Sequence, residues 1–156
     1  MIRLREAIIK DLPILLKFEK NLIEYERAFT PNLKKSNFHY YDLSSFIQNP
    51  KVSVVVVEKE DKLIASGYAL IRNNKLYKTP RQLVFLGFMY VIPEYRGKGI
   101  NEKILKYLMD WGKSKGHFEF QLDVYASNKS AIRAYKKAGF KFETITMRFD
   151  TEDKSY

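Results

Sequence analysis

The sequence predicts a compact α/β domain, and three features of its 156 residues support that prediction. The length fits one domain and is sufficient to bury a core. Apolar runs of strand length alternate along the chain with stretches in which apolar residues recur at helical spacing. We find no internal repeat, no low-complexity tract and no linker rich in Gly, Ser or Pro, so we expect a single domain spanning 1–156.

The N-terminal third predicts one strand and two helices. Alternating apolar and charged residues from Ile2 to Glu6 indicate a short strand. The apolar stripe that follows indicates a helix, which Asp11 is expected to cap and which should end before Thr30-Pro31. Asp42 is expected to cap a second, short helix that stops near Asn49-Pro50.

Three strands are expected next. Val52 to Glu58 is almost continuous Val and reads as a buried strand. A short polar turn separates it from Leu63–Ile71, so we expect an antiparallel hairpin. Leu83 to Val91 is a third apolar run, and Gly87 inside it suggests a bulge or a close backbone approach.

The C-terminal part alternates helices with strands. Helical spacing predicts a helix from Ile100 to Trp111, followed by a strand from Phe118 to Val124. A further helical stripe runs from Ala131 to Ala138 and ends at Gly139, a residue typical of helix C-caps. Alternating apolar residues predict a last strand from Phe140 to Phe149.

The composition excludes several classes of site. The chain has no cysteine, which rules out disulfides, Cys-based zinc sites and a cysteine nucleophile. His39 and His117 lack ligand spacing, so we expect no metal, although carboxylates alone could still hold Mg²⁺. No apolar run approaches the ~18 residues of a membrane span, and the N-terminus carries charge where a signal peptide is apolar. We therefore expect a cytoplasmic protein with no membrane partner.

The chain is strongly basic, with 28 Lys and Arg against 18 Asp and Glu and a net charge of +10. Residues 94–141 alone hold eleven basic and five acidic residues. Such an excess favours anionic partners, among them phosphorylated ligands, nucleic acid and membrane surfaces. Solubility alone is the alternative explanation.

The first functional motif is Arg-Gly-Lys-Gly-Ile-Asn at 96–101, between a predicted strand and a predicted helix. Its glycines let backbone N–H groups point inward, and the helix start adds its own N–H groups and partial positive charge. Together these favour binding of a pyrophosphate, with Arg96 and Lys98 adding full charges. The spacing is neither that of a Walker A loop nor Gly-x-Gly-x-x-Gly. An ordinary glycine-rich turn is the alternative.

The second motif places Asp123 and Asn128 between a strand and a helix, with Tyr135 about two turns along that helix. Such a tyrosine is able to present its hydroxyl as a proton donor. The alternative is a core tyrosine in an alanine-rich stripe.

Together the two motifs resemble those of the GCN5-related N-acetyltransferase (GNAT) superfamily over nearly the whole chain. That family's pyrophosphate loop is Arg/Gln-x-x-Gly-x-Gly/Ala. Arg96 and Gly99 match it, while Asn101 stands where Gly or Ala is usual. The second signature is Asn-x-x-Ala followed by Tyr-x-x-x-Gly-Phe, and it is met by Asn128, Ala131, Tyr135, Gly139 and Phe140.

The resemblance implies the family's α/β sandwich: a mixed sheet of six or seven strands flanked by about four helices, with two splayed parallel strands at the cofactor site. It also implies acetyl-CoA as cofactor. Asn128 matches a residue that contacts CoA. The pantetheine arm is expected on Met89, Tyr90 and Val91, and the pyrophosphate on Arg96, Gly97, Lys98, Gly99, Ile100, Asn101 and Glu102.

The implied reaction is direct attack of an amine on the thioester, with Tyr135 as general acid. The strand glutamate that many members use as base is absent, since Gly87 and Phe88 stand there. Asp123 lies where ribosomal-protein alanine acetyltransferases place a carboxylate, which makes it a candidate base. A purely structural strand-end Asp is the alternative.

The acceptor is expected to be a small-molecule or peptide amine. Glu24 and Arg27 are the candidate substrate-binding residues, and Glu26 is an alternative acceptor-side carboxylate. The competing interpretation for all three is a solvated helix face.

The favoured function is thus an acetyl-CoA-dependent N-acetyltransferase. A non-catalytic acyl-CoA-binding module on the same fold is the runner-up, supported by the missing strand glutamate and by Asn101. A nucleic-acid-binding protein ranks third, because the aromatic residues show no basic-aromatic platform. A homodimer is left open, since many relatives dimerise.

Overall fold

The computed structural model describes residues 1–153, and the chain divides into two compact units at Asp123. The first unit, Met1–Asp123, holds a five-stranded sheet with three α-helices, and the second, from Val124 onward, holds one α-helix. The strands are β1 (Ile2–Glu6), β2 (Val52–Lys59), β3 (Lys62–Asn73), β4 (Gln82–Val91) and β5 (Phe120–Leu122). The helices are α1 (Leu12–Glu26), α2 (Leu43–Gln48), α3 (Ile100–Ser114) and α4 (Lys129–Lys137), with 3₁₀ turns η1 (Ile9–Asp11) and η2 (Pro93–Tyr95).

The sheet is mixed, as the sequence predicts. Its order is β1-β2-β3-β4-β5. The first four strands pair antiparallel, and β4 pairs parallel with β5. The expected hairpin of β2 and β3 and the expected parallel pair are therefore confirmed.

The strand count is five rather than six or seven. The last predicted strand is wrong: residues 140–149 form none in the described chain. Apolar alternation gives a segment two distinct faces, but a strand also needs a neighbouring backbone to pair with. The apolar alternation is visible in the sequence, whereas the presence of a neighbouring backbone is not.

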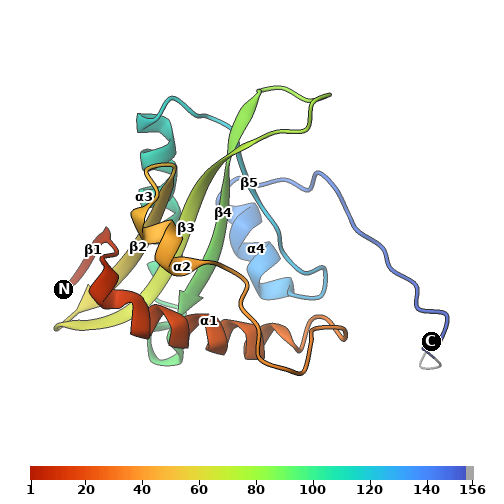
Figure 1. Ribbon diagram of the computed structural model, residues 1–156, viewed down its shortest axis with the longest axis horizontal. Coiled ribbons are helices and arrows are strands. Elements are labelled where there is room, and N and C mark those ends of the chain that lie inside the picture. Colours follow the sequence, from red (N-terminus) through yellow and green to blue (C-terminus); the bar gives the residue numbers. More distant parts are fainter. Residues whose placement is uncertain (154–156) are drawn as a thin grey trace. The chain divides into compact units, whose positions relative to one another are not determined.

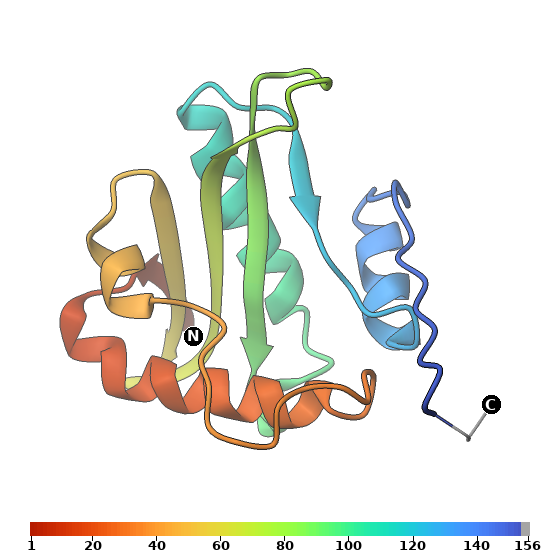
Figure 2. The ribbon, with the colours of Figure 1, turned by 45° about the vertical axis from the view of Figure 1, so that its right-hand side comes forward.

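Helices cover both faces of the sheet in the first unit. Figures 1 and 2 show α3 behind the strands and α1 with α2 in front of them. β2 lies between these layers, so its valines from Val54 to Val57 are all buried. The helices contribute apolar stripes to the same core: Leu15, Phe18, Leu22 and Ile23 from α1, and Ile100, Ile104, Leu105 and Leu108 from α3.

The two predicted helix caps differ in outcome. Asp42 Oδ1 accepts a hydrogen bond from the Ser45 N–H at 3.3 Å and caps α2 as expected. Asp11 makes no side-chain cap for α1. Its carboxylate instead accepts the Ile8 N–H at 2.8 Å and pairs with the Arg5 guanidinium at 2.8 Å. A nearby guanidinium offers a charge-assisted bond, which is stronger than a neutral cap.

Neither a membrane span nor a metal cluster is found among residues 1–153. No helix there is long and apolar enough to cross a bilayer. No group of three or more His, Asp or Glu side chains there is placed to hold a metal ion.

Candidate active site

A bulge interrupts β4 near its C-terminal end. Ser66 of β3 is opposite Tyr90, while Tyr68 is opposite Gly87, so β4 has one extra residue in this interval. Phe88 absorbs the extra length with a φ of 56°, in the left-handed region that side chains rarely adopt. The buried Ser66 hydroxyl donates to the Phe88 carbonyl at 3.1 Å. The bulge is thus fixed from the neighbouring strand.

Gly87 has a different role from the bulge itself. The sequence suggested either a bulge or a close approach at this residue, and the structure shows the close approach. A Cβ on Gly87 would overlap the ring of Tyr68 on β3. Gly87 therefore makes room for Tyr68, and the backbone distortion falls on the next residue.

β4 and β5 separate just before the bulge. Their parallel pairing covers only Val84 to Leu86 on β4, opposite Phe120 to Leu122. β4 continues beyond this point to Val91 (Figure 2). The predicted strand from Phe118 to Val124 is thus present but shorter, and the two strands splay as the resemblance implied.

Met89, Tyr90 and Val91 all lie on this separated stretch of β4. The Val91 carbonyl is already engaged, because Arg96 Nε donates to it at 2.8 Å. Tyr90 is buried against Phe18 of α1, with ring centroids 5.0 Å apart. Tyr90 and Val91 pair with Ser66 and Ala65 of β3, whereas Met89, beside the bulge, has no partner in the β3 register.

The glycine loop joins β4 to α3 in the conformation that an anion cradle needs. Gly97 and Gly99 have φ values of 74° and 77°, and Gly99 is the N-cap of α3. No other atom lies within 4 Å of where a Cβ would stand at either glycine. The Ile100 side chain is buried, so only its backbone N–H can face a ligand. Successive N–H groups at a helix start suit a diphosphate, so these residues fit the expected cofactor.

The two basic side chains of the loop contact aromatic rings of the protein. The Arg96 guanidinium lies 5.3 Å from the ring centroid of Tyr25 on α1 and 5.7 Å from that of Tyr90. Lys98 Nζ lies 5.2 Å from the ring centroid of Tyr95. Arg96 therefore connects the loop to β4 and to α1. Asn101, half-buried, and Glu102, exposed, belong to the first turn of α3.

The two predicted substrate-binding residues lie together near the C-terminal end of α1. Arg27 Nε donates to Glu24 Oε1 at 3.1 Å. Both side chains line a hollow of about 410 Å³, whose other walls are Thr30, Pro31, Leu33 and Lys35. Glu24 and Arg27 neutralise each other, and Lys35 leaves the lining of the hollow with one excess positive charge.

The segment before α2 forms an aromatic cluster that sequence reasoning missed. Buried Glu19 of α1 anchors it: the carboxylate accepts the N–H groups of Tyr40 and Tyr41 at 2.9 and 3.0 Å. The Tyr41 ring then packs against Tyr68 and Phe88 with centroids 5.2 and 5.3 Å apart. The cluster thus reaches the bulge. The available signal was the run Phe-His-Tyr-Tyr at 38–41.

Burial shifts several pKa values around this cluster. It raises the pKa of the Tyr41 hydroxyl far above its usual range, and the charges of Tyr68, Glu26 and Glu19 add to the shift. A hydrogen bond with the Phe88 backbone opposes it. Burial also raises the pKa of Glu26, and the nearby Tyr40 side chain offsets part of that rise. Tyr41 therefore remains neutral at physiological pH.

Asp123 is exposed at the residue after β5 and acts electrostatically on Tyr68. Burial raises the pKa of Tyr68 to about 12, Arg72 lowers it and Asp123 raises it. Since Tyr68 packs on Gly87, Asp123 belongs to the surroundings of the bulge.

The second unit carries Asn128 and Tyr135. Asn128 Oδ1 accepts the Ala131 N–H at 3.2 Å and caps α4, so its amide NH₂ is the group left to contact a ligand. Tyr135 is half-buried beside Phe140, with ring centroids 6.0 Å apart. Gly139 has a φ of 106°, and the Phe140 N–H bonds to the Tyr135 carbonyl at 3.0 Å, which closes the helix as predicted.

A family model described as the Acetyltransferase (GNAT) family matches residues 19–140. The chain belongs to the GNAT acetyltransferase family. It is accordingly an acyltransferase enzyme, and the superfamily resemblance noted in the sequence is confirmed.

Relatives and solved structures agree with this GNAT assignment. The thialysine N-epsilon-acetyltransferase of Mus musculus is 29% identical, over 96% of this chain and 93% of that protein. A Bacillus halodurans protein has the same fold with a TM-score of 0.83 and 24% identity, covering 95% of this chain and 98% of its own. A predicted acetyltransferase of Clostridium acetobutylicum, crystallised with acetyl-CoA, has a TM-score of 0.75 and 20% identity, over 96% of both chains.

Proposed function

We propose that this GNAT protein transfers the acetyl group of acetyl-CoA to a primary amine of a small molecule. The observation that carries the proposal is the continuous path from the splayed end of β4, through the bulge at Phe88, to the glycine loop at the start of α3. Such a path offers strand backbone to an extended arm and helix N–H groups to a diphosphate. The relatives named thialysine N-epsilon-acetyltransferase support a small amine as acceptor.

The residues of β4 and the loop would hold the cofactor through their backbone. The N–H groups of Gly99 and Ile100 lie where α3 begins and favour phosphate oxygens. Met89 and Tyr90 follow the bulge and would position the pantetheine arm. Bound acetyl-CoA supplies an activated thioester, and a bulge N–H directed at its carbonyl oxygen would contribute about 3 kcal/mol to catalysis.

In the reaction the amine nitrogen forms a bond to the acetyl carbon, and the bond from that carbon to sulfur breaks. The amine loses one proton and the departing thiolate gains one. We propose Tyr135 as the proton donor, by its match to the family's second signature. We propose Asp123 as the proton acceptor, directly or through water.

The pH dependence tests the role of Asp123. Replacing Asp123 with Asn removes the carboxylate and should displace the acidic limb of the kcat/KM profile. The measurement is the pH–rate profile of both proteins with one acceptor. An unchanged profile would make Asp123 a structural residue.

Calorimetric titration with acetyl-CoA tests the proposed function, with desulfo-CoA and ATP as controls. We expect saturable one-site binding of acetyl-CoA, much tighter than that of ATP, followed by amine-dependent thiol release. Absence of binding would refute the proposal. Binding without thiol release across a broad panel of amines would instead favour the non-catalytic module.

The single domain over 1–156, the cytoplasmic location and the homodimer stay predictions.

A further inference from the structure

Glu19 is a buried carboxylate on the apolar face of α1. Its side chain is 1% exposed and lies on the same helical stripe as Leu15, Leu22 and Ile23. Removing a carboxylate from water is costly unless the protein supplies hydrogen bonds in return. An apolar residue of similar size would fill this position without that cost. The contacts of the carboxylate therefore indicate its role.

Three polar groups from the segment between α1 and α2 converge on this carboxylate. The N–H groups of Tyr40 and Tyr41 donate to Glu19 Oε2 at 2.9 and 3.0 Å, and His39 Nδ1 lies 2.6 Å from Oε1. Successive N–H groups that face one anion form a favourable site, and hydrogen bonds to an ionised acceptor are strong. Residues 27–42, all within the described chain, form no helix or strand. These three contacts therefore fix the position of residues 39–41.

The fixed segment places Tyr41 against the bulge of β4. The Tyr41 ring packs on Phe88 with centroids 5.3 Å apart and on Tyr68 of β3 at 5.2 Å. Phe88 is the residue with a φ of 56°, and its side chain is buried. Figures 1 and 2 show the segment between α1 and α2 on the same face of the sheet as these helices. Glu19 is thus joined to the distorted residue of β4 through Tyr41.

Phe88 is supported at its backbone and at its side chain by different elements. The Ser66 hydroxyl of β3 donates to the Phe88 carbonyl, and the Tyr41 ring contacts the Phe88 ring. A residue keeps a sparsely populated conformation only when its surroundings determine it from several sides. Without the contact from Tyr41, the peptide groups beside Phe88 gain freedom to rotate. Those peptide groups are the ones that meet the thioester in the proposed function.

We propose that Glu19 is a positioning residue for acetyl transfer: by holding residues 39–41, it sets the orientation of the bulge N–H that faces the thioester carbonyl. This inference rests on the proposed function and adds a residue of α1 to that same site. The anion cradle belongs to another segment, residues 96–101, so the affinity for acetyl-CoA should not depend on Glu19. The rate of the chemical step depends steeply on where its hydrogen-bond donor stands.

Two substitutions of Glu19 separate the held geometry from the charge. Glu19→Met fills the space but accepts no hydrogen bond, and it should lower kcat by about tenfold or more while the Kd for acetyl-CoA stays near that of the parent. Glu19→Gln keeps an oxygen for both N–H groups and turns its NH₂ toward His39, whose ring accepts in its other tautomer. It should therefore keep kcat within about threefold of the parent.

Asp11→Asn is the matched control, because Asp11 is a second buried carboxylate at the other end of α1. It should lose stability in thermal unfolding and keep the parent kcat. An equal loss of kcat in Glu19→Met and Asp11→Asn would show a general effect of stability and overturn the inference. An equal loss in Glu19→Met and Glu19→Gln would also overturn it, because the charge would then matter rather than the held segment.

Tyr41→Leu provides a second route to the same contact and serves if Glu19→Met does not fold. It removes the ring that meets Phe88 and leaves the backbone N–H of residue 41 in place, so kcat should fall as in Glu19→Met. The double variant should lose no more than the larger single loss, since both changes act through one contact. Losses that multiply, or a parent-like kcat in Tyr41→Leu, would contradict the inference.

Nuclear magnetic resonance of the free protein separates this inference from the proposed function. The amide resonances of Phe88 and Met89 should shift in Glu19→Met, because the Tyr41 ring moves relative to them, and should stay in place in Asp11→Asn. This readout needs neither acetyl-CoA nor an acceptor, so it holds even if calorimetry shows no cofactor binding. Unshifted resonances in Glu19→Met would show that Glu19 does not act on the bulge.

Discussion

Phe88 combines a strained backbone with a buried side chain. An L-residue in the left-handed region costs about 1 kcal/mol or more. The Ser66 hydroxyl and the packing of the Phe88 ring against Tyr41 hold this conformation. Strain that is supported from several sides is typical of functional positions. The bulge is therefore a preformed feature of β4 and requires no ligand to create it.

Tyr135 gives the sharpest prediction for a single side chain. Replacing Tyr135 with Phe removes only the hydroxyl and should lower kcat by about 10²-fold, the lower range for loss of a general acid. The affinity for acetyl-CoA should change little, because the ring remains. Steady-state kinetics and calorimetry on the same preparations provide the measurement. A parent-like kcat would remove Tyr135 from the acid role.

Gly99 gives a second prediction at this scale. Replacing Gly99 with Ala places a side chain at a φ of 77°, which costs about 1–2 kcal/mol of stability. The new Cβ would also enter the space of the anion cradle, so acetyl-CoA binding should weaken. Gly116, with a φ of 87° beyond the other end of α3, is the matched control.

Gly116→Ala should lose similar stability and retain parent-like affinity for acetyl-CoA. Thermal unfolding and calorimetry would be run on both variants. If Gly99→Ala bound acetyl-CoA as tightly as Gly116→Ala, the 96–101 loop would not be the pyrophosphate site.

At the scale of elements, the ion pair of Arg5 and Asp11 connects β1 to the start of α1. Asp11 Oδ2 lies 2.8 Å from Arg5 Nη1, and the Asp11 side chain is only 9% exposed. The Arg5 hydrogen bond lowers the pKa of the Asp11 carboxyl, while burial partly opposes this shift. Removing the Asp11 carboxylate leaves Arg5 with its longer contact to Glu58 Oε1, at 3.3 Å, and leaves the Ile8 N–H without its carboxylate acceptor.

Asp11→Asn should therefore lower the free energy of unfolding by about 1–3 kcal/mol near neutral pH. Because the folded pKa is depressed, the stabilisation is full above the unfolded value near 3.8 and is lost as pH falls through the folded value. The gap between parent and variant should thus close below about pH 4. Denaturant titrations at several pH values would measure it. Asp110→Asn, which breaks an exposed pair with Lys106, should show little change at any pH.

The elements that the sequence predicted are those whose signals are local. The valine run of β2, the helical stripe of α3 and the Asn128 and Gly139 signals at the ends of α4 each depend on nearby residues. The sequence left open whether Gly87 marks a bulge or a close approach, because nothing local distinguishes Phe88, which carries the backbone distortion, in an apolar strand. The buried Glu19, the half-buried Glu26 and the aromatic cluster depend on how α1 meets β4, which is a tertiary property.

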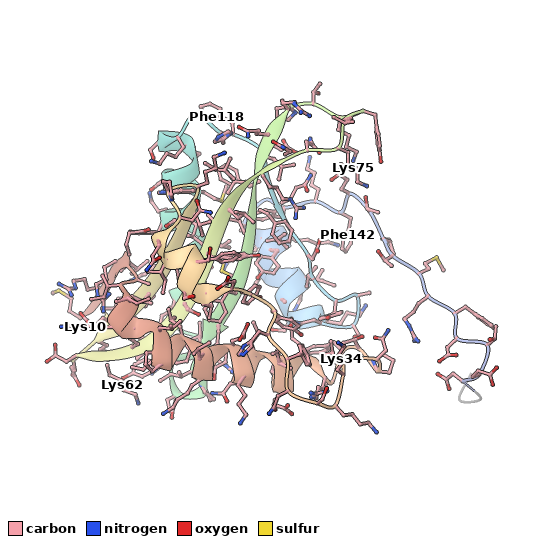
Figure 3. The ribbon with its side chains drawn as sticks, viewed as in Figure 1. Lys10, Lys34, Lys62, Lys75, Phe118 and Phe142 are labelled. Atoms are coloured by element: carbon pink, nitrogen blue, oxygen red, sulfur yellow. The ribbon has the colours of Figure 1, made fainter. Side chains whose placement is uncertain are left out.

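The whole chain has a net charge of +10, and the placement of its basic residues indicates which kind of anion the protein binds. Figure 3 shows Lys10, Lys34, Lys62 and Lys75 at separate places around the first unit, so these four lysines do not form one patch. Lysines that are spread in this way raise the general potential without forming a track for a nucleic-acid backbone, while residues 94–141, which include the glycine loop, hold eleven basic and five acidic residues. It favours a small, highly charged ligand that is held by one local cradle.

This distribution predicts that the affinity for acetyl-CoA depends only modestly on salt concentration. Raising the salt concentration from 50 to 300 mM should weaken acetyl-CoA binding severalfold, because screening reduces the attraction of the surrounding lysines while the backbone contacts persist. Duplex DNA at equal phosphate concentration should fail to displace acetyl-CoA at 150 mM salt. Competition calorimetry makes both comparisons. Displacement of acetyl-CoA by DNA, together with DNA binding that weakens by about 10³-fold over this salt range, would show that many phosphates are neutralised at once, and the basic surface would then belong to a nucleic-acid site.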